Sequence, residues 1–283
     1  MRVLVAGAKG MLGRDLVEIF SPSYEVTGWD LPDLDITRAE ETRGKIAGLR
    51  PRFIINCAAY TDVDGCESRA DLAWAVNAGG VRNLAAAALA VRARLVHLST
   101  DYVFDGASRT PYRPDDPPSP LNAYGRSKLQ GEMLLRDSGA DHLIVRTAWL
   151  YGPRGKNFVE AILRQAEAGR GLRVVNDQKG SPTFTRDLSG AIRDLLEAGA
   201  GGTFHVTNAG ACTWFEFARE IVQQREMNTV NIQPIPSEEL GRSAKRPAFS
   251  VLDCSRYETT CGKKMRSWKE GLREYFLFRG NTA

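Results

Sequence analysis

The feature that most constrains the fold is a regular alternation of strand-like and helix-like runs through the first 150 residues. Apolar, β-prone runs cover residues 2–6, 24–29, 53–56, 95–99 and 142–146. Helix-like runs separate them at residues 11–20, 38–49 and 71–91, and a further helix starts after Asn122, a typical capping residue. This alternation is typical of right-handed βαβ units. It predicts an α/β fold with a doubly wound parallel sheet, the Rossmann arrangement.

Three glycines separate the first predicted strand from the first predicted helix. They are Gly7, Gly10 and Gly13 in the run G-A-K-G-M-L-G, which also holds Met11 and Leu12. Glycines let the backbone approach a pyrophosphate, and a helix start offers free N–H groups and a positive dipole end. A purely structural tight turn is the alternative, but the strand before and the helix after the run favour dinucleotide binding.

Other residues predicted to contact the cofactor follow the second and third strands, at their carboxyl ends. Asp30 closes the second strand, where an acid can bind ribose hydroxyls and favours NADH over NADPH. Lys9 argues the other way, because a cation there could pair with a 2′-phosphate. We therefore expect NADH with dual use of NADPH. The remaining candidates are Asp35, Ile36, Ala58, Ala59 and Tyr60.

Thr100, Tyr124 and Lys128 are the candidate catalytic residues. Tyr124 and Lys128 are four positions apart, so they share one face of a helix. A nearby ammonium stabilises a phenolate, so we expect Lys128 to lower the pKa of Tyr124 and make it a proton donor. Thr100 follows a buried strand and can present its hydroxyl at the edge where such sheets bind ligands.

The second half of the chain is less regular. We expect helices at 158–168, 187–197, 214–224 and 268–278 and strands at 172–175 and 202–207. These predict a dinucleotide-binding domain at 1–150, to whose sheet about 184–207 returns, and a smaller, mainly substrate-binding α/β domain at 151–283. A proline-rich loop covers 110–121.

Composition excludes several classes of protein. Lys plus Arg exceed Asp plus Glu by only four, 38 against 34, and the excess is spread along the chain, which argues against a nucleic-acid partner. No apolar run approaches the roughly 20 residues that cross a bilayer, and the early first strand leaves no room for a leader. We expect a cytoplasmic protein with reduced cysteines, since its five cysteines lack a C-x-x-C pair, and with three packed histidines that bind no metal.

The motifs together resemble the extended short-chain dehydrogenase/reductase family over nearly the whole chain. The resemblance is carried by the glycine loop, N-C-A-A-Y-T at 56–61, Asn77, S-T-D-Y-V-F-D-G at 99–106, Tyr124-x-x-x-Lys128, R-T-A-W-L-Y-G at 146–152 and G-S-P-T at 180–183. It implies reduction of the C4 ketone of dTDP-4-dehydro-6-deoxy-L-mannose to dTDP-L-rhamnose. Tyr124 would protonate the C4 oxygen, Thr100 would hydrogen-bond it, and Lys128 would bind the nicotinamide ribose. Asp101 and Trp149 would join Thr100 in binding this nucleotide-sugar substrate.

Several alternatives remain open on the sequence. The same parts would serve another nucleotide-sugar reductase or an epimerase, and relatives of this kind include a non-catalytic regulatory subunit of methionine adenosyltransferase. The Lys245-Arg246-Pro247 run is either a solvated loop or a phosphate contact. Some relatives dimerise through carboxylate-bound magnesium, but Arg186 stands where an acid would join Asp15 and Glu274. The sequence therefore does not support Mg²⁺, and we expect a monomer or homodimer.

Overall fold

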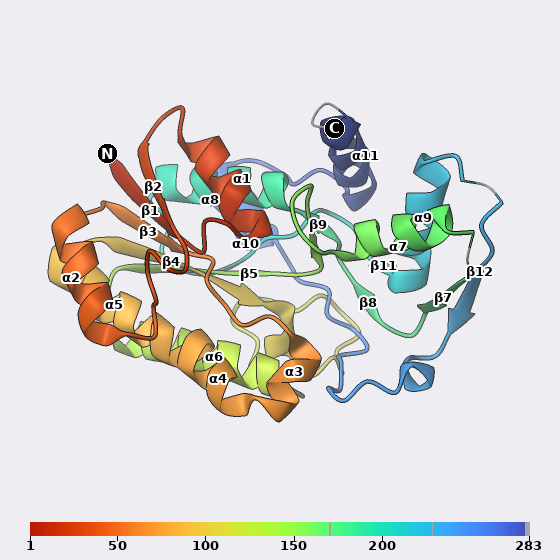
Figure 1. Ribbon diagram of the computed structural model, residues 1–283, viewed down its shortest axis with the longest axis horizontal. Helices are drawn as coiled ribbons and strands as arrows, with labels where there is room; N and C mark the ends of the chain where they lie inside the picture. Colours follow the sequence, from red (N-terminus) through yellow and green to blue (C-terminus); the bar gives the residue numbers. More distant parts are fainter. Residues whose placement is uncertain (170, 228, 281–283) are drawn as a thin grey trace.

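The computed structural model describes residues 1–169, 171–227 and 229–280, and a six-stranded parallel sheet forms its centre (Figure 1). Its strands are β1 (Arg2–Ala6), β2 (Glu25–Trp29), β3 (Phe53–Asn56), β4 (Arg94–Thr100), β5 (His142–Thr147) and β10 (Gly202–His205). They lie in the order β10-β5-β4-β3-β1-β2, and every neighbouring pair is parallel. The predicted doubly wound parallel sheet is confirmed.

Helices cover both faces of this sheet. On one face lie α1 (Met11–Phe20) and α8 (Thr185–Glu197), and on the other lie α2 (Ala39–Leu49), α5 (Gly80–Val91) and α6 (Ala123–Asp137). The central strands are apolar at successive positions because both of their faces are buried. In β1, Val3 and Val5 enter the core beneath α1 and α8, and Leu4 and Ala6 enter the opposite core.

The direction of winding fixes where ligands can bind. The chain runs from β1 outward to the edge strand β2, then crosses back over β1 to β3 and continues to β4 and β5. The connections that leave β1 and β3 therefore depart to opposite sides and open a crevice at their carboxyl ends. Ligands bind at such a switch point in open α/β sheets. The glycine loop after β1 and the alanines after β3 both lie there.

The helix predicted over 71–91 is interrupted, and the structure corrects this prediction. It consists of α4 (Ala70–Trp74), a π-helical turn (Ala75–Gly79) and α5. The short α3 (Val63–Ser68), capped by Asp62, precedes it and was not predicted. The π turn carries the buried Asn77, whose amide binds the backbone of Tyr60. Such turns often occur at functional sites, because the extra residue redirects a side chain.

A second core lies at the end of the molecule opposite β2 (Figure 1). It is built by short strand pairs and three helices, namely β6 (Leu150–Tyr151) with β9 (Thr183–Phe184), β7 (Leu172–Val175) with β12 (Ile232–Ile235), β8 (Lys179–Gly180) with β11 (Cys212–Thr213), α7 (Phe158–Glu167), α9 (Trp214–Gln224) and α11 (Trp268–Gly280). The short α10 (Ser255–Cys261) packs against α8 and β10 instead. The domain boundary at residue 150 stays a prediction. Within the described residues, no helix is both long and apolar enough to cross a membrane.

An ion pair joins the loop at residues 242–246 to α3. The carboxylate of Asp64 accepts hydrogen bonds from both terminal nitrogens of Arg246, at 2.7 and 3.1 Å, and from the Ala244 N–H at 3.0 Å. Arg242 lies 3.6 Å from the same carboxylate. The hydrogen bonds from Arg246 hold the pKa of Asp64 well below its usual value. The run that the sequence left open between a solvated loop and a phosphate contact is therefore partly engaged within the protein, through Arg246.

We predict that Asp64→Asn lowers the free energy of unfolding at neutral pH, because it removes the ion pair with Arg246. The loss should be only about 1 kcal/mol, because the Asp64 side chain is 35% exposed and solvent screens the pair. A depressed pKa stabilises the fold above the ordinary carboxyl pKa, and this stabilisation is lost as the pH falls below it. The difference from wild type should therefore shrink between about pH 7 and about pH 3 in urea titrations. Asp137→Asn, at an exposed carboxyl on α6, is the control. A deficit independent of pH would contradict the prediction.

Candidate active site

The glycine loop brings the ends of β1 and β3 into close contact. Gly7 has φ +80°, and a Cβ on it would lie 2.6 Å from the Ala58 nitrogen. A Cβ on Gly13 would lie 2.1 Å from the Gly7 carbonyl oxygen. Gly10 is the N-cap of α1 and makes no side-chain capping bond, so Met11 and Leu12 begin a helix whose first N–H groups are open to an anion. These residues fit a dinucleotide pyrophosphate.

The acid at the end of β2 lies against this loop. Asp30 accepts hydrogen bonds from the Lys9 and Leu31 N–H groups, both at 2.9 Å. Asp35 accepts from the Thr37 hydroxyl at 2.7 Å and from its N–H at 3.0 Å, and the hydroxyl bond in particular lowers the pKa of Asp35. Ile36 is buried, and a Cβ on Gly80 of α5 would meet its side chain. Of the two acids, Asp30 is the one that contacts the glycine loop.

Residues after β3 are held by buried amides. The Ala58 N–H donates to Asn56 Oδ1 at 3.1 Å, and the Tyr60 N–H donates to Asn77 Oδ1 at 2.8 Å. Asn77 Nδ2 donates in turn to the Tyr60 carbonyl and to the Ser127 hydroxyl, both at 3.0 Å. Asn77 therefore joins Tyr60, a predicted cofactor contact, to the helix that carries Tyr124. Asn77 is among the residues that carry the family resemblance, but the sequence alone predicts no role for it.

Thr100 and Tyr124 lie together, as the sequence predicts. Thr100 ends β4, where its Oγ1 accepts from the Tyr102 N–H at 3.1 Å and donates to Asp101 Oδ1 at 3.0 Å. Asn122 caps α6 as expected, accepting from the Gly125 N–H at 2.8 Å. The Tyr124 phenol lies close enough to the Thr100 hydroxyl for that hydroxyl to lower its pKa. The helix and the strand thus place two hydroxyls at one point.

The pKa of Tyr124 is raised, whereas we expected Lys128 to lower it. Burial raises the pKa of Tyr124, the charge of Asp101 raises it further, and the nearby Thr100 hydroxyl only partly opposes this. Lys128 is not among the main groups that shift it in the protein by itself, and Lys128 Nζ donates instead to the Leu98 carbonyl at 2.6 Å. Lys128 is 3% exposed, and burial lowers its own pKa to about 8. Tyr124 is therefore held as a neutral, protonated phenol.

Two buried oxygens beside Thr100 have no hydrogen-bond partner among the described residues. They are Asp101 Oδ2 and Thr147 Oγ1. Thr147 lies directly opposite Thr100 in the β4–β5 register, and it was not singled out from the sequence. Burial raises the pKa of Asp101 to about 6. Unpaired buried polar groups are costly, so both oxygens are suited to binding a polar ligand.

Trp149 is packed more tightly than a free sugar platform requires. Its ring stacks on that of Trp214, with centroids 3.5 Å apart and planes 6° apart. A Cβ on Gly180 would lie 2.5 Å from the Trp149 ring, and Trp149 itself has φ +48°. Trp214, expected in a core, does pack in the second one, as does Trp268. Contact between Trp149 and substrate stays a prediction.

The carboxylates considered for magnesium are engaged elsewhere. Asp15 is buried on α1 and accepts from the Thr185 hydroxyl, with Arg186 3.9 Å away. Glu274 pairs with Arg266 at 3.5 Å. Among the described residues, no group of three or more His, Cys, Asp or Glu side chains could hold a metal ion.

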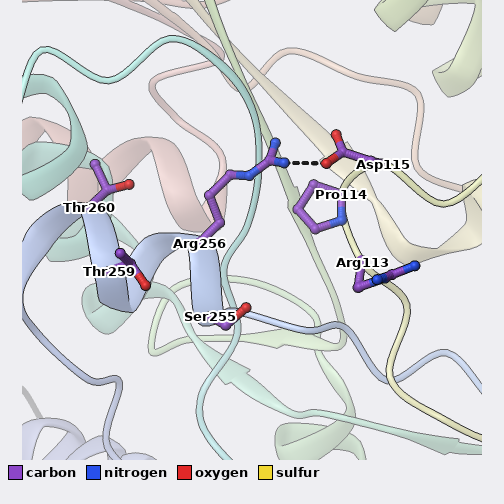
Figure 2. Close-up of a pocket in the computed structure, with 7 residues that line it drawn as sticks. All are labelled: Arg113, Pro114, Asp115, Ser255, Arg256, Thr259 and Thr260. Carbon is purple, nitrogen blue, oxygen red and sulfur yellow. Dashed lines mark hydrogen bonds and ion pairs between the residues drawn. The ribbon is translucent and has the colours of Figure 1, made fainter.

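A surface cavity between the proline-rich loop and α10 lies apart from these residues (Figure 2). It is lined by Arg113, Pro114, Asp115, Ser255, Arg256, Thr259 and Thr260. Figure 2 shows the ion pair between Arg256 and Asp115 across it. None of the predicted cofactor or substrate residues lines this cavity, so it is not the site at the carboxyl edge.

Comparisons with known proteins point to one family over nearly the whole chain. The model of the RmlD substrate binding domain family matches residues 1–277. A dTDP-4-dehydrorhamnose reductase of Streptomyces griseus is 42% identical, over 97% of this chain and 93% of the relative. A dTDP-4-keto-6-deoxy-D-glucose reductase of Streptomyces niveus is also 42% identical, over 97% and 96%.

A solved structure of a dTDP-4-dehydrorhamnose reductase is also similar to this chain. The crystal structure of dTDP-4-dehydrorhamnose reductase from Bacillus anthracis in complex with NADP has a TM-score of 0.95 and 41% identity, covering 98% of this chain and 99% of that one. With the matching family model and relatives of about 40% identity along nearly the whole length, the chain belongs to the RmlD substrate binding domain family, within the extended short-chain dehydrogenases/reductases.

Proposed function

We propose that this protein is an oxidoreductase that reduces the C4 ketone of dTDP-4-dehydro-6-deoxy-L-mannose to dTDP-L-rhamnose with NADH or NADPH. The observation that carries the proposal is that the Thr100 and Tyr124 hydroxyls lie near each other, with the buried Lys128, at the ligand-binding edge of the sheet. Membership of the family and the name of the Streptomyces griseus relative support this substrate.

Each of the three candidate catalytic residues has a separate role in the proposed carbonyl reduction. When bound, the nicotinamide cofactor supplies the hydride that C4 gains. Tyr124, whose raised pKa keeps its proton in place, gives that proton to the C4 oxygen and is reprotonated from solvent. Thr100 donates a hydrogen bond to the same oxygen as charge develops on it. Lys128 stabilises the transient phenolate and binds the nicotinamide ribose.

Cofactor binding is assigned to the crevice between β1 and β3. The pyrophosphate lies on the Gly7–Gly13 loop and the first turn of α1, and the ribose hydroxyls lie at Asp30. NADP bound to the Bacillus anthracis relative supports dual use of the two cofactors. Asp35, Ile36, Ala58, Ala59 and Tyr60 line the rest of the path. Asp101 and Trp149 bind the sugar.

A second candidate is reduction of a different dTDP-4-keto sugar. The Streptomyces niveus relative, equally similar, is named for dTDP-4-keto-6-deoxy-D-glucose. Assay of both ketones with each cofactor, following loss of reduced nicotinamide, decides between them. An epimerase shares the catalytic parts, and a regulatory subunit has no need of the Thr100, Tyr124 and Lys128 set. Cytoplasmic location and a monomeric or homodimeric state stay predictions.

We predict that Tyr124→Phe lowers kcat at least about 100-fold, the typical scale for loss of a general acid. The ring still fills its half-buried site, so stability and cofactor binding should change little. The measurement is single-substrate kinetics with the dTDP-4-keto sugar generated in situ by the upstream enzymes. Tyr24→Phe, in the core beneath α1, is the matched control and should keep wild-type kcat. Full activity of Tyr124→Phe would reject the proposed proton donor.

We also predict that Asp30→Asn raises kcat/KM for NADPH relative to NADH about tenfold, because it removes the negative charge that repels a 2′-phosphate. Asp33→Asn, three residues along in the exposed turn, should leave the ratio unchanged. The ratio is obtained from initial rates with each cofactor at saturating sugar. An unchanged ratio in Asp30→Asn would show that this carboxylate does not select the cofactor.

A further inference from the structure

A fully buried glutamate lies one helical turn beyond Lys128. Glu132 is on α6, and its side chain is completely inaccessible to solvent. Residues 124, 128 and 132 are spaced four apart, so the carboxylate shares the helix face that carries the phenol and the ammonium. Neither the proton transfer nor the substrate contacts described above use it.

The Glu132 carboxylate joins α6 to two neighbouring strands. One oxygen accepts from the Ser99 hydroxyl at 2.6 Å and from Arg146 Nε at 2.9 Å. The other accepts from a terminal nitrogen of Arg146 at 2.7 Å and from Arg136 at 2.8 Å. Ser99 and Arg146 are paired in the β4–β5 register. Glu132 therefore holds the strand position immediately before Thr100.

Arg146 is equally enclosed, at 1% exposure. Its guanidinium lies 5.2 Å from the centre of the Phe104 ring, and it donates to the Pro114 carbonyl at 3.2 Å. It also lies 3.4 Å from His205 Nε2. Pro114 lines the surface cavity of Figure 2, so the buried pair extends from the catalytic helix to the inner side of that cavity.

The groups that act electrostatically on Lys128 come from three elements. Glu132 on α6 and Cys57 after β3 favour its charged form, although burial has the larger, opposite effect. His97 on β4 is buried near it and stays neutral, since burial and the charge of Lys128 lower the pKa of His97. Tyr124 lies on the same helix face. At neutral pH the Cys57 thiol is uncharged, because burial raises its pKa to about 12. Glu132 is therefore the charged group that supports the ammonium.

We propose that Glu132, held by Arg146, is a positioning residue that fixes Lys128 in place and keeps it charged for the reduction. Buried ion pairs are often replaceable by apolar residues without loss of stability, so stability alone gives no reason for a pair at this position. The hydrogen bonds to Ser99 and Arg146 set the distance between α6 and β4, and thereby the place of Lys128 beside the Leu98 carbonyl. This inference rests on the proposed function.

The test compares the full-length wild type with two variants, Glu132→Gln and Glu132→Met combined with Arg146→Met. The double variant removes both buried charges, so it leaves no buried guanidinium unpaired, and Arg136, which also loses Glu132, is 36% exposed to solvent. We expect the alkaline limb of kcat against pH to move about one unit lower in Glu132→Gln, at the small end of the effect of a nearby opposite charge, and to move lower by a smaller amount in the double variant, which also loses a positive charge. KM for the sugar should stay within about twofold, because the substrate contacts are intact.

A second readout does not depend on the sugar. As the pH rises, NADPH binding, followed by the fluorescence of NADPH, should begin to weaken at a lower pH in the variants than in wild type. The reason is that Lys128 loses its charge at a lower pH in the variants. Asp141→Asn is the control, since it breaks the 2.9 Å pair with Arg94 at the opposite ends of β4 and β5. It should match wild type in both measurements.

The outcomes separate this inference from the proposed function. A wild type without turnover of the sugar would reject the function, and the NADPH titration would still test the pair. A folded variant with the wild-type alkaline limb and wild-type NADPH titration would overturn the inference. Failure of both variants to fold would also overturn it, because the pair would then serve the fold itself.

Discussion

The packing of one face of α6 against the carboxyl ends of β4 and β5 is the interaction on which the site depends. Tyr124, Lys128 and Glu132 lie along this face and reach three consecutive residues of β4. The Tyr124 phenol lies beside the Thr100 hydroxyl, Lys128 donates to the Leu98 carbonyl, and Glu132 accepts from Ser99. A shift of the helix by one residue would break all three contacts at once. The geometry of the hydroxyl pair therefore follows from the register between a helix and a strand.

Burial dominates the ionisation of this region. It raises the pKa of Tyr124, lowers that of Lys128 to about 8 and raises that of Asp101 to about 6. Each shift favours the neutral form, as expected where few charges are available to compensate for lost water. The result suits a proton donor, because the phenol keeps its proton until charge develops on a bound ligand. The usual picture of a lysine that lowers a tyrosine pKa does not describe the protein by itself.

The order and type of the main elements could be predicted from the sequence because each is encoded locally. Continuous apolar strands that alternate with helices, the first of them followed by a glycine loop, leave little choice of architecture, and Asn122 caps α6 as expected. The π turn at Ala75–Gly79 could not be predicted, because it depends on Asn77 binding the backbone of Tyr60, seventeen residues away. The ring stack of Trp149 and Trp214 likewise joins residues 65 positions apart.

By itself, the sequence determined the parallel α/β fold and the glycine loop, and it singled out Thr100, Tyr124 and Lys128 as candidates, because local periodicity, the end of a strand and spacing within one helix define them. Only the tertiary structure decided how charges are distributed in that site. Lys128 bonds to a strand carbonyl rather than to the phenol, and Glu132 meets Arg146 across fourteen residues of chain. The physical reason is that desolvation and pairing depend on what surrounds a group in space, and no local pattern records those neighbours.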